Sequence, residues 1–345
     1  MARPPSQVAT NTRPGSGAAG AVQRRGRAEA LPKSRGQPSR RLMPISMLNT
    51  YWLSGPASGA GLALAALLAS ATQPEPAPVR VVDARTHQPV PYASVGVPGR
   101  PLGTVADAQG RFQPAQTGAA PTDTLVVSCV GYQPRRLVRA ALQQLPELPL
   151  EPQAQALGEA VVKGASWKRR RVGREAGGGF VLFNFHTQAD TVPAVKLGRE
   201  GGAILRVRPH SFIEDAHVFL RQWHYQGLRF RLNVRAVDAD NHPAASLLTQ
   251  DIQFAVPDSA SGWQHLDLRP YNVNVGAEHR VAVTLEWLAG QLKPGKPATW
   301  RTWPGVVVPG AFSATHHTVH RHKSEDAWQV EPVNLSLYIT TASPN

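Results

Sequence analysis

The chain has 345 residues, and 37 Lys and Arg against 23 Asp and Glu give it a formal net charge of +14. Its 30 glycines and 31 prolines favour turns and extended chain over long helices. A single cysteine excludes a disulfide scaffold and a four-cysteine zinc site. The length predicts about two domains of roughly 150 residues each. These features indicate a strand-rich, multi-domain protein and name no reaction.

Residues 1–46 are predicted to be a disordered basic extension. The first 50 residues carry nine basic residues and one acid, Glu29, among Pro, Gly, Ala and Ser. Such a composition buries too little apolar surface to offset chain entropy. A basic tail can bind nucleic acid, but no aromatic residue interleaves with these arginines before Tyr51. We therefore expect no nucleic-acid partner.

A secretory signal peptide is predicted at residues 47–71. The apolar run 59–68 follows a basic flank and ends in Ala69-Ser70-Ala71, a small-residue pattern typical of a cleavage site. The run is shorter than the roughly 20 residues of a membrane span, although an uncleaved anchor stays an alternative. We predict that translation starts at one of the two internal methionines just before this run. The mature chain would then be exported to the periplasm, the outer membrane or the cell surface.

Short motifs predict a small antiparallel β-sandwich over residues 78–150. In chain order they are VRVVD, PVPYASV, GTVADAQGRF and DTLVVSCVGYQP. In the third motif, Asp107 supplies a side-chain acceptor and Gly110 a free φ, which together predict a tight turn between two strands. The lone cysteine, Cys129, lies in the apolar fourth motif, so we interpret it as a core residue rather than a nucleophile.

These motifs resemble the carboxypeptidase-like regulatory domain. The resemblance implies a transthyretin-like, seven-stranded sandwich of the kind found in envelope proteins of Bacteroidetes-type bacteria. It implies a folding or interaction module without catalytic residues. The next segment, 156–163, is similar to the stretch that follows this module in TonB-linked outer-membrane receptors. A receptor barrel of about 22 strands needs more than roughly 220 residues, and fewer remain after Lys163, so a complete receptor is excluded.

A linker at 151–178 and a second β-sandwich at 179–343 are predicted next. Five basic residues within 167–174, followed by three glycines at 177–179, have the composition of solvated, flexible chain. Alternating apolar residues at 228–234 and 281–287 predict half-buried strands, the first with a wet, basic outer face. Since no stretch shows a helical period, the predicted fold class is all-β, with a jelly-roll-like antiparallel sandwich following the transthyretin-like one. This half resembles the C-terminal half of secreted Bacteroidetes proteins that have no assigned activity.

Two groups of side chains are candidates for ligand binding. Trp300 and Trp303 lie in a Pro- and Gly-rich loop, where they could stack on sugar rings. Arg229 and Arg231 would lie on the basic strand face. Tyr225 could also stack on a sugar ring. Each of these aromatic side chains could instead pack in the core or in a loop.

A histidine cluster is the candidate for metal binding. Its members are His316, His317, His320 and His322, which could take up Zn²⁺ or Cu²⁺ or form an exposed polar loop that binds metal only weakly. His322 and Glu325 have the H-x-x-E spacing of zinc carboxypeptidases, but no later histidine completes the ligand set. No G-x-S-x-G nucleophile motif occurs.

These observations predict a non-catalytic, exported cell-envelope protein that acts in protein interaction or assembly at the outer membrane or cell surface. A glycan-binding accessory protein is the alternative, and a protein related to zinc metallocarboxypeptidases is a less favoured one. We expect no cofactor. The expected partner is an envelope protein or a glycan, and we allow for a peripheral association with the outer membrane.

Overall fold

A computed structural model describes residues 77–153, 167–185, 197–222, 224–258, 261–295 and 305–344. The predicted basic extension, the signal peptide and the candidate residues Trp300 and Trp303 lie outside the described residues. The chain divides into two compact units, Met1–Ala71 and Thr72–Asn345, of which the second holds all the described residues. None of the helical segments in the described part of the chain has the length and hydropathy of a membrane-spanning helix.

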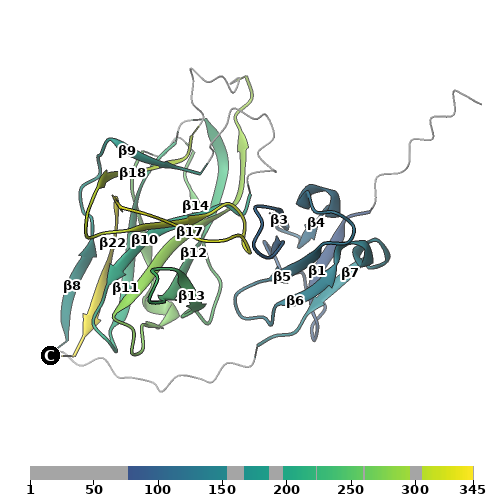
Figure 1. The fold of residues 1–345 in the computed structure, drawn as a ribbon, viewed down its shortest axis with the longest axis horizontal. Helices are drawn as coiled ribbons and strands as arrows, with labels where there is room; N and C mark the ends of the chain where they lie inside the picture. Colours follow the sequence, from purple (N-terminus) through teal and green to yellow (C-terminus); the bar gives the residue numbers. More distant parts are fainter. Residues whose placement is uncertain are drawn as a thin grey trace, which may run out of the picture. The chain divides into compact units, whose positions relative to one another are not determined.

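The first sandwich consists of seven strands in two sheets (Figure 1). One sheet has the order β4-β1-β7 and the other β3-β2-β5-β6. The strands are β1 (Val79–Asp83), β2 (Ser94–Gly96), β3 (Gly103–Val105), β4 (Arg111–Phe112), β5 (Thr124–Ser128), β6 (Arg135–Val138) and β7 (Glu147–Leu150), with short 3₁₀ segments at Pro114–Thr117 and Arg139–Gln144. The predicted seven-stranded sandwich is confirmed, with one difference: β1 and β7 pair in parallel.

Local turn chemistry and alternating apolar residues explain this sandwich. Asp107 accepts backbone hydrogen bonds from Gln109 and Arg111 at 2.8 Å each, and Gly110 has a φ of +73°. This is the turn predicted from the sequence, and it joins β3 to β4. The core between the two sheets is fully buried at positions such as Val81 and Leu125.

The second sandwich consists of two larger, antiparallel sheets. One has the order β13-β12-β17-β10-β19-β20, with β14 also on β12; the other has the order β21-β18-β11-β22-β8, with β15 and β16 on β11 and β9 on β18. The strands of the first sheet are β10 (Glu200–Arg206), β12 (Tyr225–Val237), β13 (Pro243–Ser246), β14 (Ile252–Val256), β17 (Arg280–Leu292), β19 (Thr318–Arg321) and β20 (Gln329–Glu331). Those of the second are β8 (Lys168–Gly173), β9 (Val181–Asn184), β11 (Phe212–Arg221), β15 (Ser261–Asp267), β16 (Val273–Asn274), β18 (Val307–Phe312), β21 (Val333–Leu335) and β22 (Leu337–Ser343). A 3₁₀ turn, Arg269–Tyr271, joins β15 to β16.

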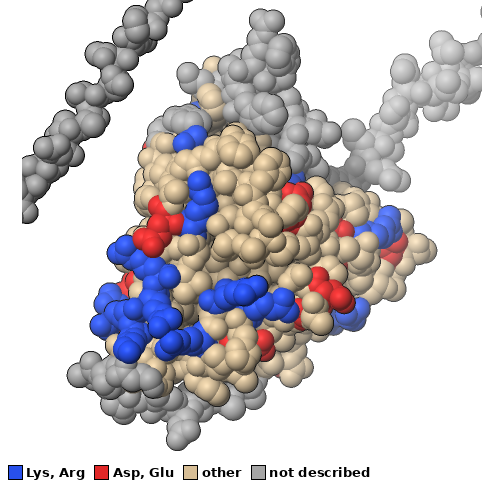
Figure 2. All heavy atoms as spheres, turned by 60° about the vertical axis from the view of Figure 1, so that its left-hand side comes forward, with Lys and Arg blue, Asp and Glu red and all other residues tan. Residues whose placement is uncertain are grey.

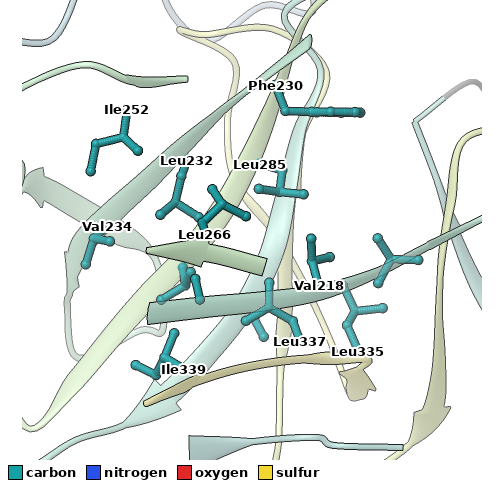
Figure 3. Packing of buried hydrophobic residues seen from close by; sticks show 14 of the residues in the cluster. Val218, Phe230, Leu232, Val234, Ile252, Leu266, Leu285, Leu335, Leu337 and Ile339 are labelled. Atoms are coloured by element: carbon teal, nitrogen blue, oxygen red, sulfur yellow. The ribbon is translucent and has the colours of Figure 1, made fainter. Parts of the chain in front are cut away.

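Alternation of side chains builds the core of the second sandwich. Every second residue of β12 and β17 points inward, and these side chains meet those of β11, β15 and β22 from the facing sheet (Figure 3). Trp287 and Tyr225 are fully buried, with their rings 5.3 Å apart and nearly perpendicular. The predicted strands at 228–234 and 281–287 are therefore confirmed, and Tyr225 is a core residue that cannot stack on a ligand.

The basic tract assigned to the linker is a strand of the second sandwich instead. Residues Lys168–Gly173 form β8, which pairs antiparallel with β22, with Val172 opposite Ile339. Val172 packs against the hydrophobic core, while the four basic side chains before it stay exposed. Within the described residues, sandwich structure thus begins at β8, ten residues before the predicted end of the linker.

Candidate functional site

The arginines of the predicted basic strand face do not lie on a wet surface. The Arg231 side chain is only 3% exposed and donates hydrogen bonds to Asp251 at 2.6 Å and Glu286 at 2.8 Å. It also donates to Ser94 Oγ at 3.1 Å and to the Tyr92 carbonyl oxygen at 2.9 Å, both in the first sandwich. Burial alone would lower the pKa of Arg231, but Glu286 and Asp251 outweigh it and hold the pKa well above the ordinary value. Arg231 therefore joins the two sandwiches and is not available to a ligand.

The same face continues into a second buried ionic cluster around Glu200. Arg321 binds Glu200 Oε2 through two nitrogens, at 2.9 and 2.7 Å. Asn233 and Thr284 donate hydrogen bonds to Oε1. The expected solvent face of the sheet is buried at Arg231 and Glu200, and these buried charges are paired, as burial of a charge requires. Arg229, the other candidate arginine, is half-buried with its guanidinium 5.5 Å from the Tyr92 ring centroid.

The four candidate histidines do not converge on one point. His316 Nδ1 lies 3.0 Å from the hydroxyls of Ser313 and Thr315, in the loop before β19. His320 is buried on β19 and contacts Glu331 at 3.1 Å, and its ring centroid is 6.4 Å from that of His322. His317 lies on the wall of a separate hollow with His316. The candidate histidines are spread along the chain: His316 and His317 precede β19, His320 lies within it and His322 follows it. Among the described residues, they do not form a group of three converging metal-type ligand atoms.

Burial disfavours the ionised forms of Cys129 and Glu325, the two potentially reactive side chains considered in the sequence. Burial raises the pKa of the Cys129 thiol to about 12, which keeps it protonated and fits its interpretation as a core residue. Burial also raises the pKa of Glu325, whose side chain lies beside Gly96 of the first sandwich.

The outer face of the second sheet carries a different set of polar and aromatic side chains. β11 points Asp215 and His217 away from the core, since the residues between and beside them are buried. β15 points Trp263 and His265 the same way, and β22 adds Tyr338. His217 lies directly between His265 on β15 and Tyr338 on β22. We call these five residues, together with Arg169 and Arg171 on β8, the outer-face site.

Ring contacts connect the members of the outer-face site. The His217 ring stacks on Tyr338, with centroids 4.4 Å apart and planes 7° apart, and on His265 at 4.6 Å. Trp263 meets Tyr338 edge-on at 5.0 Å, and Arg171 lies 5.8 Å from the Tyr338 centroid. All four rings are at least partly exposed, so the site offers apolar ring surface beside polar edges to a ligand.

The charges around this site are organised in pairs. Arg169 binds Glu214 at 2.7 Å, and Arg171 binds Glu175 at 2.9 Å. Figure 2 shows Lys and Arg side chains gathered on this side of the second sandwich, where β8 lies, with acidic side chains scattered beside them. Because both side chains of the Arg171–Glu175 pair are more than half exposed, this ion pair is weak, and Arg171 can exchange it for an anionic ligand. Glu214 is buried, so its pair with Arg169 is harder to break.

Three members of the site have the residue types of a metal centre. One ligand atom from each of Asp215, His217 and His265 lies within 4.8 Å of the other two. His217 Nε2 is 2.9 Å from Asp215 Oδ1. Partial burial lowers the pKa of His217 below its ordinary value, which leaves a ring nitrogen unprotonated at neutral pH.

Sequence reasoning missed this site because its members come from four separated strands. The signal that could have indicated it is the alternation D-x-H at Asp215 and W-x-H at Trp263, each inside a strand-like stretch. Only the register of β11 between β15 and β22 brings the two patterns together.

Comparison with protein families confirms the identity of the first sandwich. The motifs at β1 to β7 and the seven-stranded fold agree with a family-model match. Residues 80–162 match the CarboxypepD_reg-like domain. This CarboxypepD_reg-like domain covers only the N-terminal part of the described chain, so the outer-face site lies beyond it. No curated protein matches the chain.

Among solved structures, the chain is similar to particles of infectious bursal disease virus. The Gx strain structure is 10% identical, with a TM-score of 0.23 over 73% of this chain and 61% of that one. The D431N mutant VP2 protein is 11% identical, with a TM-score of 0.20 over 72% of this chain and 56% of that one. The chain thus spans about three fifths of the length of these structures, and such low TM-scores support no comparison of function.

Proposed function

We propose that this chain is a non-catalytic binding protein of the cell envelope and that the outer-face site binds a glycan. The observation that carries the proposal is the pair of partly exposed rings, Trp263 and Tyr338, 5.0 Å apart on one sheet face beside Arg171. Aromatic faces cover the apolar C–H faces of sugar rings, and the polar ring edges stay hydrated. Arginine next to such rings favours sugars with carboxylate or sulfate groups, because guanidinium binds these groups with two parallel hydrogen bonds.

Binding to neutral and uronic-acid oligosaccharides on a glycan array tests this proposal. The variant Trp263→Ala is expected to lower the affinity for the best-bound glycan by about tenfold, equivalent to about 1.4 kcal/mol. Trp263 lies outside the core cluster, so the variant should keep the unfolding midpoint. Phe312→Ala is the matched control, since Phe312 is 71% exposed and contacts Phe180 rather than the outer-face site. Equal binding by both variants, or no binding by the wild type, contradicts the glycan proposal.

Export to the envelope belongs to the same proposal. It is supported by the basic flank, the apolar run at 59–68 and the Ala69-Ser70-Ala71 ending. The envelope location and the Bacteroidetes type rest on the resemblance of the motifs at 78–150, and the family match at residues 80–162 supports the domain alone. The N-terminal peptide mass of the native protein tests it: a start near residue 72 supports export, and recovery of residues 1–42 contradicts it.

A protein-interaction role is the second candidate, favoured by the CarboxypepD_reg-like domain at residues 80–162. In this case the first sandwich would be the binding module, and the partner another envelope protein. A pull-down from the native envelope distinguishes the two candidates. Capture that survives Trp263→Ala and an excess of glycan favours the protein partner.

A further inference from the structure

Two neighbouring strands place two imidazoles and a carboxylate at one point of the sheet surface. Asp215 and His217 are two residues apart on β11 and therefore share a face. His265 lies opposite His217 on β15. We propose that Asp215, His217 and His265 form a binding site for a divalent transition-metal ion such as Zn²⁺.

The spacing of the three ligand atoms suits such an ion. They lie within 4.8 Å of one another. Zinc bonds of about 2.0–2.2 Å in tetrahedral geometry hold ligand atoms about 3.3 Å apart. His217 and Asp215 already meet at 2.9 Å, so an ion would replace the proton between them. The exposed His265 has to turn out of its stack on His217 to direct a ring nitrogen at the ion, and the fourth position stays open to water or to a ligand.

The choice of metal follows from the donor types. Imidazole nitrogen suits Zn²⁺, Cu²⁺ and Ni²⁺, whereas Mg²⁺ and Ca²⁺ prefer all-oxygen sites. Stacking on Tyr338, with centroids 4.4 Å apart, fixes the plane of the His217 ring. A ring held in this way loses little entropy on binding, which favours a built site over adventitious coordination.

The neighbouring charges permit a cation here. Each arginine around the site is paired with its own carboxylate: Arg169 with Glu214, Arg171 with Glu175 and Arg269 with Asp267. Asp215, by contrast, has the imidazole of His217 as its partner among the described ion pairs. A bound dication would therefore face the Asp215 carboxylate, which has no ion pair with an arginine among the described residues.

Isothermal titration of the chelator-treated full-length protein with Zn²⁺ tests the proposal. The wild type should bind one ion at this site. His265→Ala and the isosteric Asp215→Asn should each weaken that binding by more than about tenfold. A His316→Ala, His317→Ala variant is the matched control and should bind as the wild type does. Each variant should keep the wild-type unfolding midpoint without metal, because these side chains lie outside the core cluster.

Substitution by Co²⁺ adds a spectroscopic readout. A four-coordinate nitrogen and oxygen site should give visible absorption in the wild type that is absent in His265→Ala. The proposal is overturned if the wild type binds no Zn²⁺, if His265→Ala and Asp215→Asn bind as tightly as the wild type, or if the loss appears in the His316, His317 variant instead. The three proposed ligands belong to the outer-face site, but titration with Zn²⁺ alone measures metal binding without a glycan, so failure of the glycan proposal is distinguishable from failure of the metal proposal.

Discussion

Glu200 has no exposed surface, yet it stays ionised. Burial by itself would raise its pKa, but the guanidinium groups of Arg321 and Arg235 and the Thr284 hydroxyl outweigh this and lower the pKa of Glu200 to about 2. A carboxyl whose pKa falls on folding stabilises the fold at any pH above its unfolded pKa. The ordinary value is 4.5, so this stabilisation is complete above pH 4.5 and is lost as the pH falls toward 2.

Glu200→Gln should therefore change the pH dependence of stability. The wild type is expected to lose roughly 3 kcal/mol of unfolding free energy through this group between pH 4.5 and 2. The variant should be less stable than the wild type at pH 7, and the gap should close at low pH. Urea unfolding at pH 7, 4 and 3 measures this. Glu175→Gln is the control, since its exposed pair with Arg171 contributes little; a gap that stays constant with pH contradicts the prediction.

Strand β8 contains four consecutive basic residues, which an edge strand can tolerate. It is the last strand of its sheet and pairs only with β22 along the sheet path. The N–H of Arg174 donates to the Leu337 carbonyl oxygen at 2.9 Å. Hydrogen-bonded pairs recur at every second residue of an antiparallel ladder, so Arg170 is bonded to Thr341 and the N–H of Arg171 points away from β22. The charged edge also discourages pairing with other chains.

Proline at neighbouring positions of β8 tests this register. Arg170→Pro removes a ladder hydrogen bond to Thr341 and should cost about 1–3 kcal/mol of unfolding free energy. Arg171→Pro removes the same charge but no ladder bond, so it should cost less than about 1 kcal/mol. Urea unfolding gives the two values, because only Arg170→Pro removes the hydrogen bond from the residue-170 N–H to the Thr341 carbonyl oxygen. The reverse order of the two costs would show a different register.

In the compact unit Thr72–Asn345, two separate hydrophobic cores are joined by a polar contact. Arg231 of the second sandwich binds Ser94 Oγ and the Tyr92 carbonyl oxygen of the first while it neutralises Glu286 and Asp251. Such a joint gives little hydrophobic stabilisation but is demanding in geometry, because loss of the cation leaves two carboxylates poorly paired.

Arg231→Met should uncouple the two cores. We expect the free energy of unfolding to fall by about 3–5 kcal/mol and the heat-capacity trace to separate into two transitions. Arg229→Met is the matched control, since Arg229 is half-buried and contacts only the Tyr92 ring among the described interactions. It should retain the wild-type profile. Adding Glu286→Leu to Arg231→Met should recover part of the loss, and a wild-type profile for Arg231→Met would contradict the role of the joint.

Elements whose pattern is local are predictable from the sequence. Alternating apolar residues at 228–234 and 281–287 predicted β12 and β17, and Asp107 with Gly110 predicted the turn between β3 and β4. The motifs of residues 78–150 led to the CarboxypepD_reg-like domain. These features follow from backbone periodicity and turn geometry, which depend on a few neighbouring residues.

What covers each sheet face, and which distant side chains meet, depends on tertiary packing. Alternation separates the two faces of a strand but does not say that the face with Arg231 and Glu286 is buried, because that depends on the packing of another part of the chain. In the same way, β8 has no apolar alternation of its own and forms a strand because β22 offers it backbone partners. His217 and His265 are adjacent only through the register of β11 and β15, which is fixed by the shared core.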